Sequence, residues 1–176
     1  IQSGLVNTAK SKNSSDLPQL LIIEDNPDVV IYLQACLENR FQVDVAYNGK
    51  IGIEKAIEQL PDLIISDVMM PEKDGYEVCD TLKIDERTSH IPIVLLTAKA
   101  DAASKIVGLQ RGADAYLSKP FNKEELLVRL EKMVERQSRL MAYFSKQFSS
   151  GFSSRINPQE SEEAILIEDV FIQKVR

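Results

Sequence analysis

The chain has 176 residues, a formal net charge of -6 at pH 7, 44% hydrophobic residues and 27% charged residues. This length accommodates one ordinary domain of roughly 100 to 150 residues with extensions, and no apolar run approaches the about 20 residues that cross a bilayer. The acidic balance argues against nonspecific nucleic-acid binding by this chain, because such binding depends on neutralising phosphates with Lys and Arg.

Residues 1–18 are polar and lack periodicity, so we predict a linker there. From Leu20 onward, short apolar runs alternate with amphipathic stretches of helical length. This alternation is typical of βα units and predicts a parallel sheet of five strands with five helices.

The first strand is predicted over 19–24. A helix follows it, opening at Asn26, which caps, and Pro27, whose fixed φ suits the first helical position. The second strand is predicted over 42–46 and the second helix over 49–59, where apolar residues recur at helical spacing.

The third strand is predicted over 62–66, and a polar turn then leads to a helix over 75–84. The fourth strand is predicted over 91–96. A short helix over 102–110 and a fifth strand over 114–117 complete the alternation.

The last helix has a clear predicted start, with Asn122 as its cap, Glu125 as a capping-box partner, and Phe121 facing Leu126 as a hydrophobic staple. Its apolar positions continue to Phe148, further than one helix needs to cover a five-stranded sheet. Two interpretations stay open for this extension, a simple connector or a helix that pairs with its copy in a dimer.

The domain organisation follows from these elements. We predict a linker over 1–18, one domain over 19–136, and a helical extension with a linker toward a downstream domain over 137–176. The chain starts at Ile1 and stops at Arg176 inside an apolar-periodic segment, so we expect it to be a piece of a longer polypeptide.

Three acidic side chains and one lysine lie where buried strands are expected to end. Glu24 and Asp25 close the first apolar run, Asp67 closes another, and Lys119 follows a third. Ligands bind outside the carboxyl ends of strands in an open parallel sheet, so these groups are expected to converge there. Carboxylates beside an ammonium predict a site for Mg²⁺, which prefers oxygen ligands, and for a phosphoryl group.

Four strings of sequence are specific enough to compare with a known family. They are Leu20 to Asn26, Asp67 to Gly75, Leu95 to Ala98, and Gly112 to Phe121. In this order they resemble the motifs of a response-regulator receiver domain, over about two-thirds of the chain. The resemblance implies a flavodoxin-like (βα)5 three-layer sandwich with parallel strand order 2-1-3-4-5.

The resemblance also implies roles for the acidic cluster. Asp67 looks like the phosphoacceptor, whose carboxylate forms an acyl phosphate. Asp25 and Asp67 would bind Mg²⁺ directly, Glu24 would act through a metal-bound water, and the backbone carbonyl of Met69 would be a further ligand. Lys119 would offset negative charge on the phosphoryl oxygens.

Two more residues are expected to carry the signal away from the site. By the resemblance, the Thr97 hydroxyl donates to the new phosphoryl group, and Tyr116 rotates into the space that is vacated. The surface formed by the fourth helix, fifth strand and fifth helix is then the output face. The Lys119-Pro120 peptide bond is expected to be cis.

The implied partners are a histidine kinase domain, in the same chain or in another molecule, and a downstream DNA-binding domain in a hybrid parent chain that is itself a histidine kinase. Homodimerisation through the output face or the extended final helix is left open. We expect a cytoplasmic location, with no membrane contact by this chain, although the parent could be anchored in the inner membrane. The only enzymatic chemistry expected of this stretch is weak self-phosphorylation and self-dephosphorylation.

Two other functions compete with this interpretation. Phosphohydrolases of the haloacid dehalogenase group also use an aspartyl nucleophile, but they need a second Asp two residues later, where this chain has Met69. A phosphorylation-independent interaction module with the same fold is disfavoured by the intact acidic cluster, Thr97 and Lys119. The apolar Met69 also cannot orient an attacking water, so we hypothesise that the phosphorylated form is long-lived.

Overall fold

The computed structural model describes residues 17–98, 106 and 110–150. The chain falls into two compact units, Ile1–Glu131 and Lys132–Arg176. The first unit contains the whole sheet. Most of the linker predicted over 1–18, most of the helix predicted over 102–110, and the extension after residue 150 lie outside the described residues.

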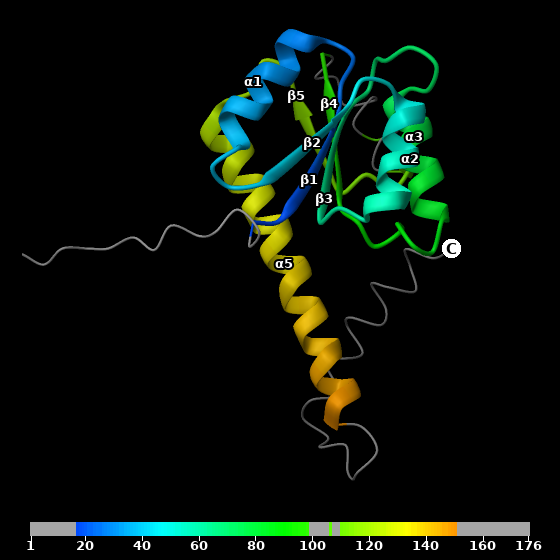
Figure 1. The fold of residues 1–176 in the computed structure, drawn as a ribbon, viewed down its shortest axis with the longest axis vertical. Coiled ribbons are helices and arrows are strands. Elements are labelled where there is room, and N and C mark those ends of the chain that lie inside the picture. Colours follow the sequence, from blue (N-terminus) through cyan, green and yellow to red (C-terminus); the bar gives the residue numbers. More distant parts are fainter. Residues whose placement is uncertain (1–16, 99–105, 107–109, 151–176) are drawn as a thin grey trace, which may run out of the picture. The chain divides into compact units, whose positions relative to one another are not determined.

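Five parallel strands form one sheet in the order β2-β1-β3-β4-β5, which confirms the predicted flavodoxin-like topology. The strands are β1 (Gln19–Ile23), β2 (Gln42–Ala46), β3 (Leu63–Asp67), β4 (Ile93–Thr97) and β5 (Ala115–Ser118). The described helices are α1 (Pro27–Leu37), α2 (Gly49–Gln59), α3 (Gly75–Ile84) and α5 (Lys123–Ser150). Within the first unit, α1 and α5 cover one face of the sheet, and α2 and α3 cover the other (Figure 1).

The helices begin where local hydrogen bonds favour them. The Asn26 side chain accepts from the Asp28 amide at 2.9 Å, which confirms the predicted cap of α1. Asp74 and Glu77 form a reciprocal capping box at the start of α3. At the start of α5, the Asn122 side chain accepts from the Glu124 amide at 2.7 Å.

Four predicted strands lie slightly off their observed positions. The first was predicted over 19–24 and spans Gln19–Ile23, and the fifth was predicted over 114–117 and spans Ala115–Ser118. The fourth was predicted over 91–96 but spans Ile93–Thr97, because Pro92 has no N–H to donate and precedes the strand. The third was predicted over 62–66 but spans Leu63–Asp67, because pairing with β4 continues past Asp67, with the Val68 amide donating to the Leu96 carbonyl at 2.9 Å. Asp67 is therefore the last residue of its strand.

The core fills both faces of the sheet. All five residues of β3 and of β4 are buried, as expected for central parallel strands with helices on both sides. On the α2 and α3 face, Leu21, Ile64 and Leu95 belong to one cluster with Val78 and Cys79 of α3. Strand ends are consequently fixed by packing from two sides, which is a precondition for a well-ordered site at the sheet edge.

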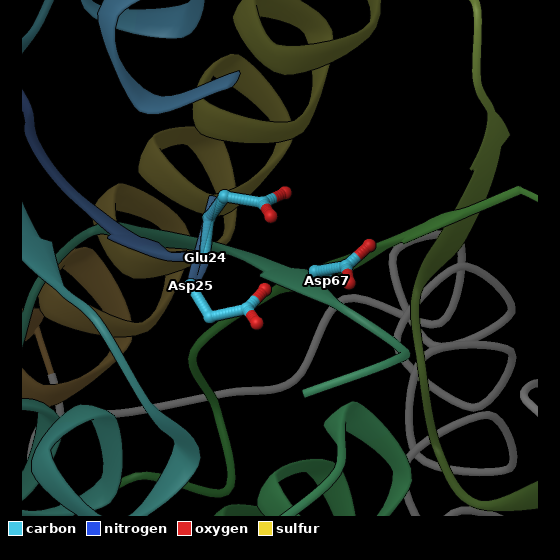
Figure 2. A group of neighbouring side chains, drawn as sticks. All are labelled: Glu24, Asp25 and Asp67. Atoms are coloured by element: carbon cyan, nitrogen blue, oxygen red, sulfur yellow. The ribbon is translucent and has the colours of Figure 1, made fainter. Parts of the chain in front are cut away.

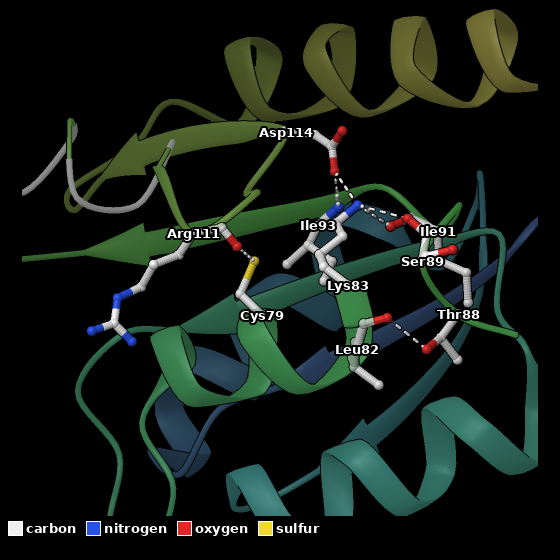
Figure 3. Close-up of polar contacts among 9 residues, drawn as sticks. All are labelled: Cys79, Leu82, Lys83, Thr88, Ser89, Ile91, Ile93, Arg111 and Asp114. Carbon is white, nitrogen blue, oxygen red and sulfur yellow. Dashed lines mark hydrogen bonds and ion pairs between the residues drawn. The ribbon is translucent and has the colours of Figure 1, made fainter. Parts of the chain in front are cut away.

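A polar cluster fixes the amino-terminal ends of β4 and β5 (Figure 3). The Lys83 ammonium donates to the Asp114 carboxylate at 2.8 Å, to the Ile91 carbonyl at 2.8 Å and to the Ser89 carbonyl at 3.3 Å. The same Asp114 oxygen accepts from the Ile93 amide at 2.9 Å. One ion pair thus ties the end of α3 to the start of two strands and holds their register.

The described part of the second unit is the continuation of α5 to Ser150. It exposes Met141, Tyr143 and Phe144, and the rings of Tyr143 and Phe144 contact edge to face with centroids 5.9 Å apart. Among the helices within the described residues, none has the length and hydropathy to span a bilayer.

Candidate functional site

The acidic cluster lies at the carboxyl ends of β1 and β3. Glu24 and Asp25 directly follow β1, and Asp67 ends β3. One carboxylate oxygen from each of the three lies within 4.8 Å of the others, and the three side chains face a common space (Figure 2). Glu24 and Asp67 are buried whereas Asp25 is exposed, so the cluster is open to solvent on the Asp25 side.

Lys119 follows β5 and joins this cluster, as predicted from the sequence. Its ammonium lies 2.7 Å from a Glu24 carboxylate oxygen and 2.7 Å from Asp67 Oδ1. Its backbone amide donates to the Thr97 carbonyl at 2.7 Å, so the residue is tied to the end of β4. The Lys119-Pro120 peptide bond is cis, as the resemblance implied.

The charges of the site are unbalanced. Burial raises the pKa of Glu24, against the hydrogen bond from Lys119, which lowers it. Burial lowers the pKa of Lys119, but the hydrogen bonds to Asp67 and Glu24 prevail and the pKa ends above its ordinary value. With all groups ionised, three carboxylates and one ammonium sum to -3 + 1 = -2 (Glu24, Asp25, Asp67 and Lys119).

This excess of negative charge fits a hard divalent cation. The donor set offers carboxylate oxygens and contains no thiolate or imidazole, which suits Mg²⁺ rather than a softer metal. The exposed Asp25 leaves one side of the cluster accessible to solvent.

Backbone amides orient two of the carboxylates. Asp67 Oδ2 accepts from the Met69 amide at 3.1 Å, and Glu24 Oε1 accepts from the Asn26 amide at 3.2 Å. The Met69 side chain is 71% exposed. Met69 thus lies beside the proposed phosphoacceptor, while the ligand role predicted for its carbonyl stays a prediction.

Gly75 allows α3 to approach the end of β3. A Cβ at this position would lie 2.3 Å from the Asp67 carbonyl oxygen and 2.9 Å from Val68 Cα, which backbone atoms cannot accommodate without moving. The Gly75 amide donates to the Val68 carbonyl at 3.0 Å. A glycine is therefore required here to keep Asp67 in place.

The two predicted signalling residues share one face of the sheet. Thr97 ends β4 and pairs with Ser118, while Tyr116 of β5 pairs with Leu95. Since side chains alternate along strands, Thr97 and Tyr116 point to the same side. Tyr116 is buried, and its hydroxyl is hydrogen-bonded to that of Tyr76.

Sequence reasoning found Glu24, Asp25, Asp67 and Lys119, which the structure brings together. It missed Tyr76, which contacts Tyr116 from α3, because no periodicity or spacing links residues that are 40 positions apart.

The comparisons with known proteins agree with this geometry. The family model for the response regulator receiver domain matches residues 20–131. "Histidine kinase P4" of Formosa agariphila is 44% identical over 126 residues, which cover 72% of this chain and 9% of that protein. The "Response regulator ArlR" of Staphylococcus saprophyticus is 40% identical over 122 residues, which cover 69% of this chain and 54% of that protein.

A solved structure is also similar. It is the receiver domain of sensor histidine kinase PA1611 from Pseudomonas aeruginosa PAO1, described with a magnesium ion coordinated in its active site cleft. The two share 30% identity with a TM-score of 0.64, over 68% of this chain and 98% of that one. The chain thus spans one whole receiver structure but only about half, or far less, of the curated proteins that it matches.

Proposed function

The chain belongs to the response regulator receiver domain family, and from this premise we propose that Asp67 is the residue that accepts the phosphoryl group in a two-component pathway. The observation that carries the proposal is the double contact of Lys119, whose ammonium lies 2.7 Å from both Glu24 and Asp67. A carboxylate in this position can attack phosphorus while a cationic side chain lies beside the oxygens that gain charge.

We propose that the phosphoryl donor is a phosphohistidine of the kinase. A carboxylate oxygen of Asp67 forms a bond to phosphorus as the bond between phosphorus and the imidazole nitrogen breaks, and the electron pair leaves with the imidazole. Asp25 and Asp67 would hold Mg²⁺ directly, Glu24 through a water, and the Met69 carbonyl as a further ligand; the ion would supply positive charge to the phosphoryl oxygens. Lys119 supplies the remaining cationic contact.

Intact-protein mass spectrometry after incubation with acetyl phosphate tests this function. We expect the mass of one phosphoryl group to be added in the presence of Mg²⁺, and no addition when EDTA removes the metal. No added mass with Mg²⁺ would instead favour the phosphorylation-independent interaction module.

Receiver domains interact with histidine kinases, and we propose that the kinase here is part of the same parent chain or a separate molecule in the cytoplasm. The similarity to "Histidine kinase P4" supports a hybrid parent, and the similarity to the "DNA-binding dual master transcriptional regulator RpaA" supports a transcriptional output. Thr97 and Tyr116 would pass the signal to the face of β5 and α5, together with the predicted fourth helix.

The stability of the acyl phosphate is open to a direct prediction. The Met69 side chain is exposed beside Asp67 and carries no hydrogen-bond donor and only a weak acceptor, its thioether sulfur. We expect Met69→Asn to hasten dephosphorylation by about tenfold, because an amide can orient the attacking water. Decay of the phosphorylated mass after removal of acetyl phosphate measures this rate. Met69→Leu is the matched control and should decay like wild type, and equal rates for Met69→Asn and wild type would contradict the hypothesis.

For the extended α5 helix we propose a second copy of the chain as its partner. Beyond Leu130, which is buried in the domain core, a stripe follows the helix at alternating spacings of four and three residues with one polar interruption. Its positions are Met133, Gln137, Leu140 and Phe144. This is the a/d spacing of a two-stranded coiled coil. A helix of this kind is marginal alone, since helices in water are stabilised mainly by packing their apolar face.

Light scattering on the whole chain tests this pairing. We expect a dimer for wild type and a monomer for Leu140→Lys, because a buried, unpaired charge at a d position opposes association. Arg139→Gln is the control, since Arg139 lies outside the a/d stripe and its side chain is exposed. A wild-type monomer at every concentration measured would show that the helix is only a connector.

A further inference from the structure

The Tyr76 side chain has two partners, one at its hydroxyl and one over the face of its ring. It lies in the first turn of α3, packs against the core cluster that contains Tyr116, and its hydroxyl is hydrogen-bonded to the Tyr116 hydroxyl. The Arg111 guanidinium lies over the Tyr76 ring, 5.4 Å from the centroid. This distance is within the range of a cation–π contact.

Arg111 is itself anchored to α3. Its guanidinium pairs with the Asp80 carboxylate at 2.6 Å, and its carbonyl accepts from the Cys79 thiol at 3.3 Å. Asp80 is four residues after Tyr76, so both side chains lie on one face of the helix. The segment before β5 is therefore fixed to α3 at the place where it covers the Tyr76 ring.

The backbone of Tyr116 is held independently of its side chain. Tyr116 pairs with Leu95 in the sheet, and its carbonyl accepts from the Arg129 guanidinium at 3.2 Å. The orientation of the ring is thus the adjustable feature. A buried hydroxyl needs a hydrogen-bond partner, and Tyr76 supplies one for the inward orientation of Tyr116.

We propose that Tyr76 is a positioning residue that holds Tyr116 in its buried orientation and thereby favours the phosphorylated state of the domain. This inference rests on the proposed function and on the role that the family resemblance implies for Tyr116, whose ring turns inward when the Thr97 hydroxyl donates to the new phosphoryl group. Thr97 and Tyr116 both point to the α3 side of the sheet. By linkage, a contact that stabilises the inward Tyr116 must also raise the affinity for a phosphoryl group or its mimic, in proportion to the difference between the two states.

A double-mutant cycle on the whole chain tests the proposal with two readouts. The first is the Kd of the phosphoryl mimic beryllofluoride with Mg²⁺, and the second is the solvent exposure of a fluorotyrosine at position 116, measured by ¹⁹F NMR without the mimic. We expect Tyr76→Phe to weaken beryllofluoride binding by about fivefold, a size common for coupled neighbours, and to increase exposure at position 116. In a Tyr116→Phe background, Tyr76→Phe should change the Kd no further.

The controls separate the possible results. Tyr47→Phe removes a hydroxyl from a tyrosine that is 54% exposed and should change neither readout. An equal loss of affinity on both backgrounds would show that Tyr76 acts only on general stability, and an unchanged exposure at position 116 would also overturn the proposal. If wild type fails to bind beryllofluoride, the proposed function fails, whereas the ¹⁹F exposure still decides whether Tyr76 holds Tyr116.

Discussion

Asp67→Asn is expected to abolish phosphoryl incorporation from acetyl phosphate. The amide oxygen is a far weaker nucleophile than a carboxylate, so the covalent step itself is lost, and we expect the rate to fall by at least about 10³-fold. Asparagine has nearly the same volume, and Lys119 keeps its 2.7 Å contact with Glu24, so the fold should be retained. Intact mass after a fixed incubation with Mg²⁺ measures the effect.

The control for this experiment is Glu54→Gln, which removes an exposed carboxylate on α2 and should leave incorporation unchanged. Hydroxylamine should release the phosphoryl group from wild type, because an acyl phosphate reacts with it. Undiminished incorporation in Asp67→Asn would contradict the assignment. Peptide mapping would then show whether Asp25 accepts the group instead.

The topology of the sheet was predictable because it follows from local patterns. Strands β3 and β4 are buried on both faces and read as continuous apolar runs, and Asn26-Pro27 marks a helix start by its own chemistry. The ends of β3 and β4 were off by one or two residues, because a strand ends where its neighbour stops pairing with it. The end of a strand therefore depends on the adjacent strand and cannot be deduced from the local sequence alone.

The four charged residues of the site were predictable for a related reason. Parallel strands deliver the residues that follow them to one edge, so Asp25, Asp67 and Lys119 had to meet there. The choice of partners was not predictable. Lys119 contacts Glu24 and Asp67, and the Tyr76 hydroxyl meets that of Tyr116, through side-chain packing between elements remote in sequence.

Lys119→Gln is expected to change metal binding and phosphoryl transfer in opposite directions. The substitution removes the positive charge that lies 2.7 Å from two carboxylates. Less repulsion of a cation should tighten Mg²⁺ binding by about tenfold, given the strength of charge interactions at a partly buried site. Phosphoryl transfer should slow by about 10² to 10³-fold, the usual loss when one contact to a developing negative charge is removed.

Calorimetric titration measures the affinity for Mg²⁺, and the rate of mass gain from acetyl phosphate measures phosphoryl transfer. The pKa of Lys119 lies above its ordinary value, so the ammonium stays charged throughout the neutral range and the effect should not depend on pH there. Lys55→Gln is the matched control, because it removes an ammonium paired at 2.8 Å with Asp44, a different carboxylate, and it should change neither quantity. Weaker Mg²⁺ binding in Lys119→Gln would mean that Lys119 organises the carboxylates more than it repels the ion. An unchanged rate of phosphoryl transfer would show that Lys119 takes no part in the chemistry. The ammonium would then serve only to hold Glu24 and Asp67 in place.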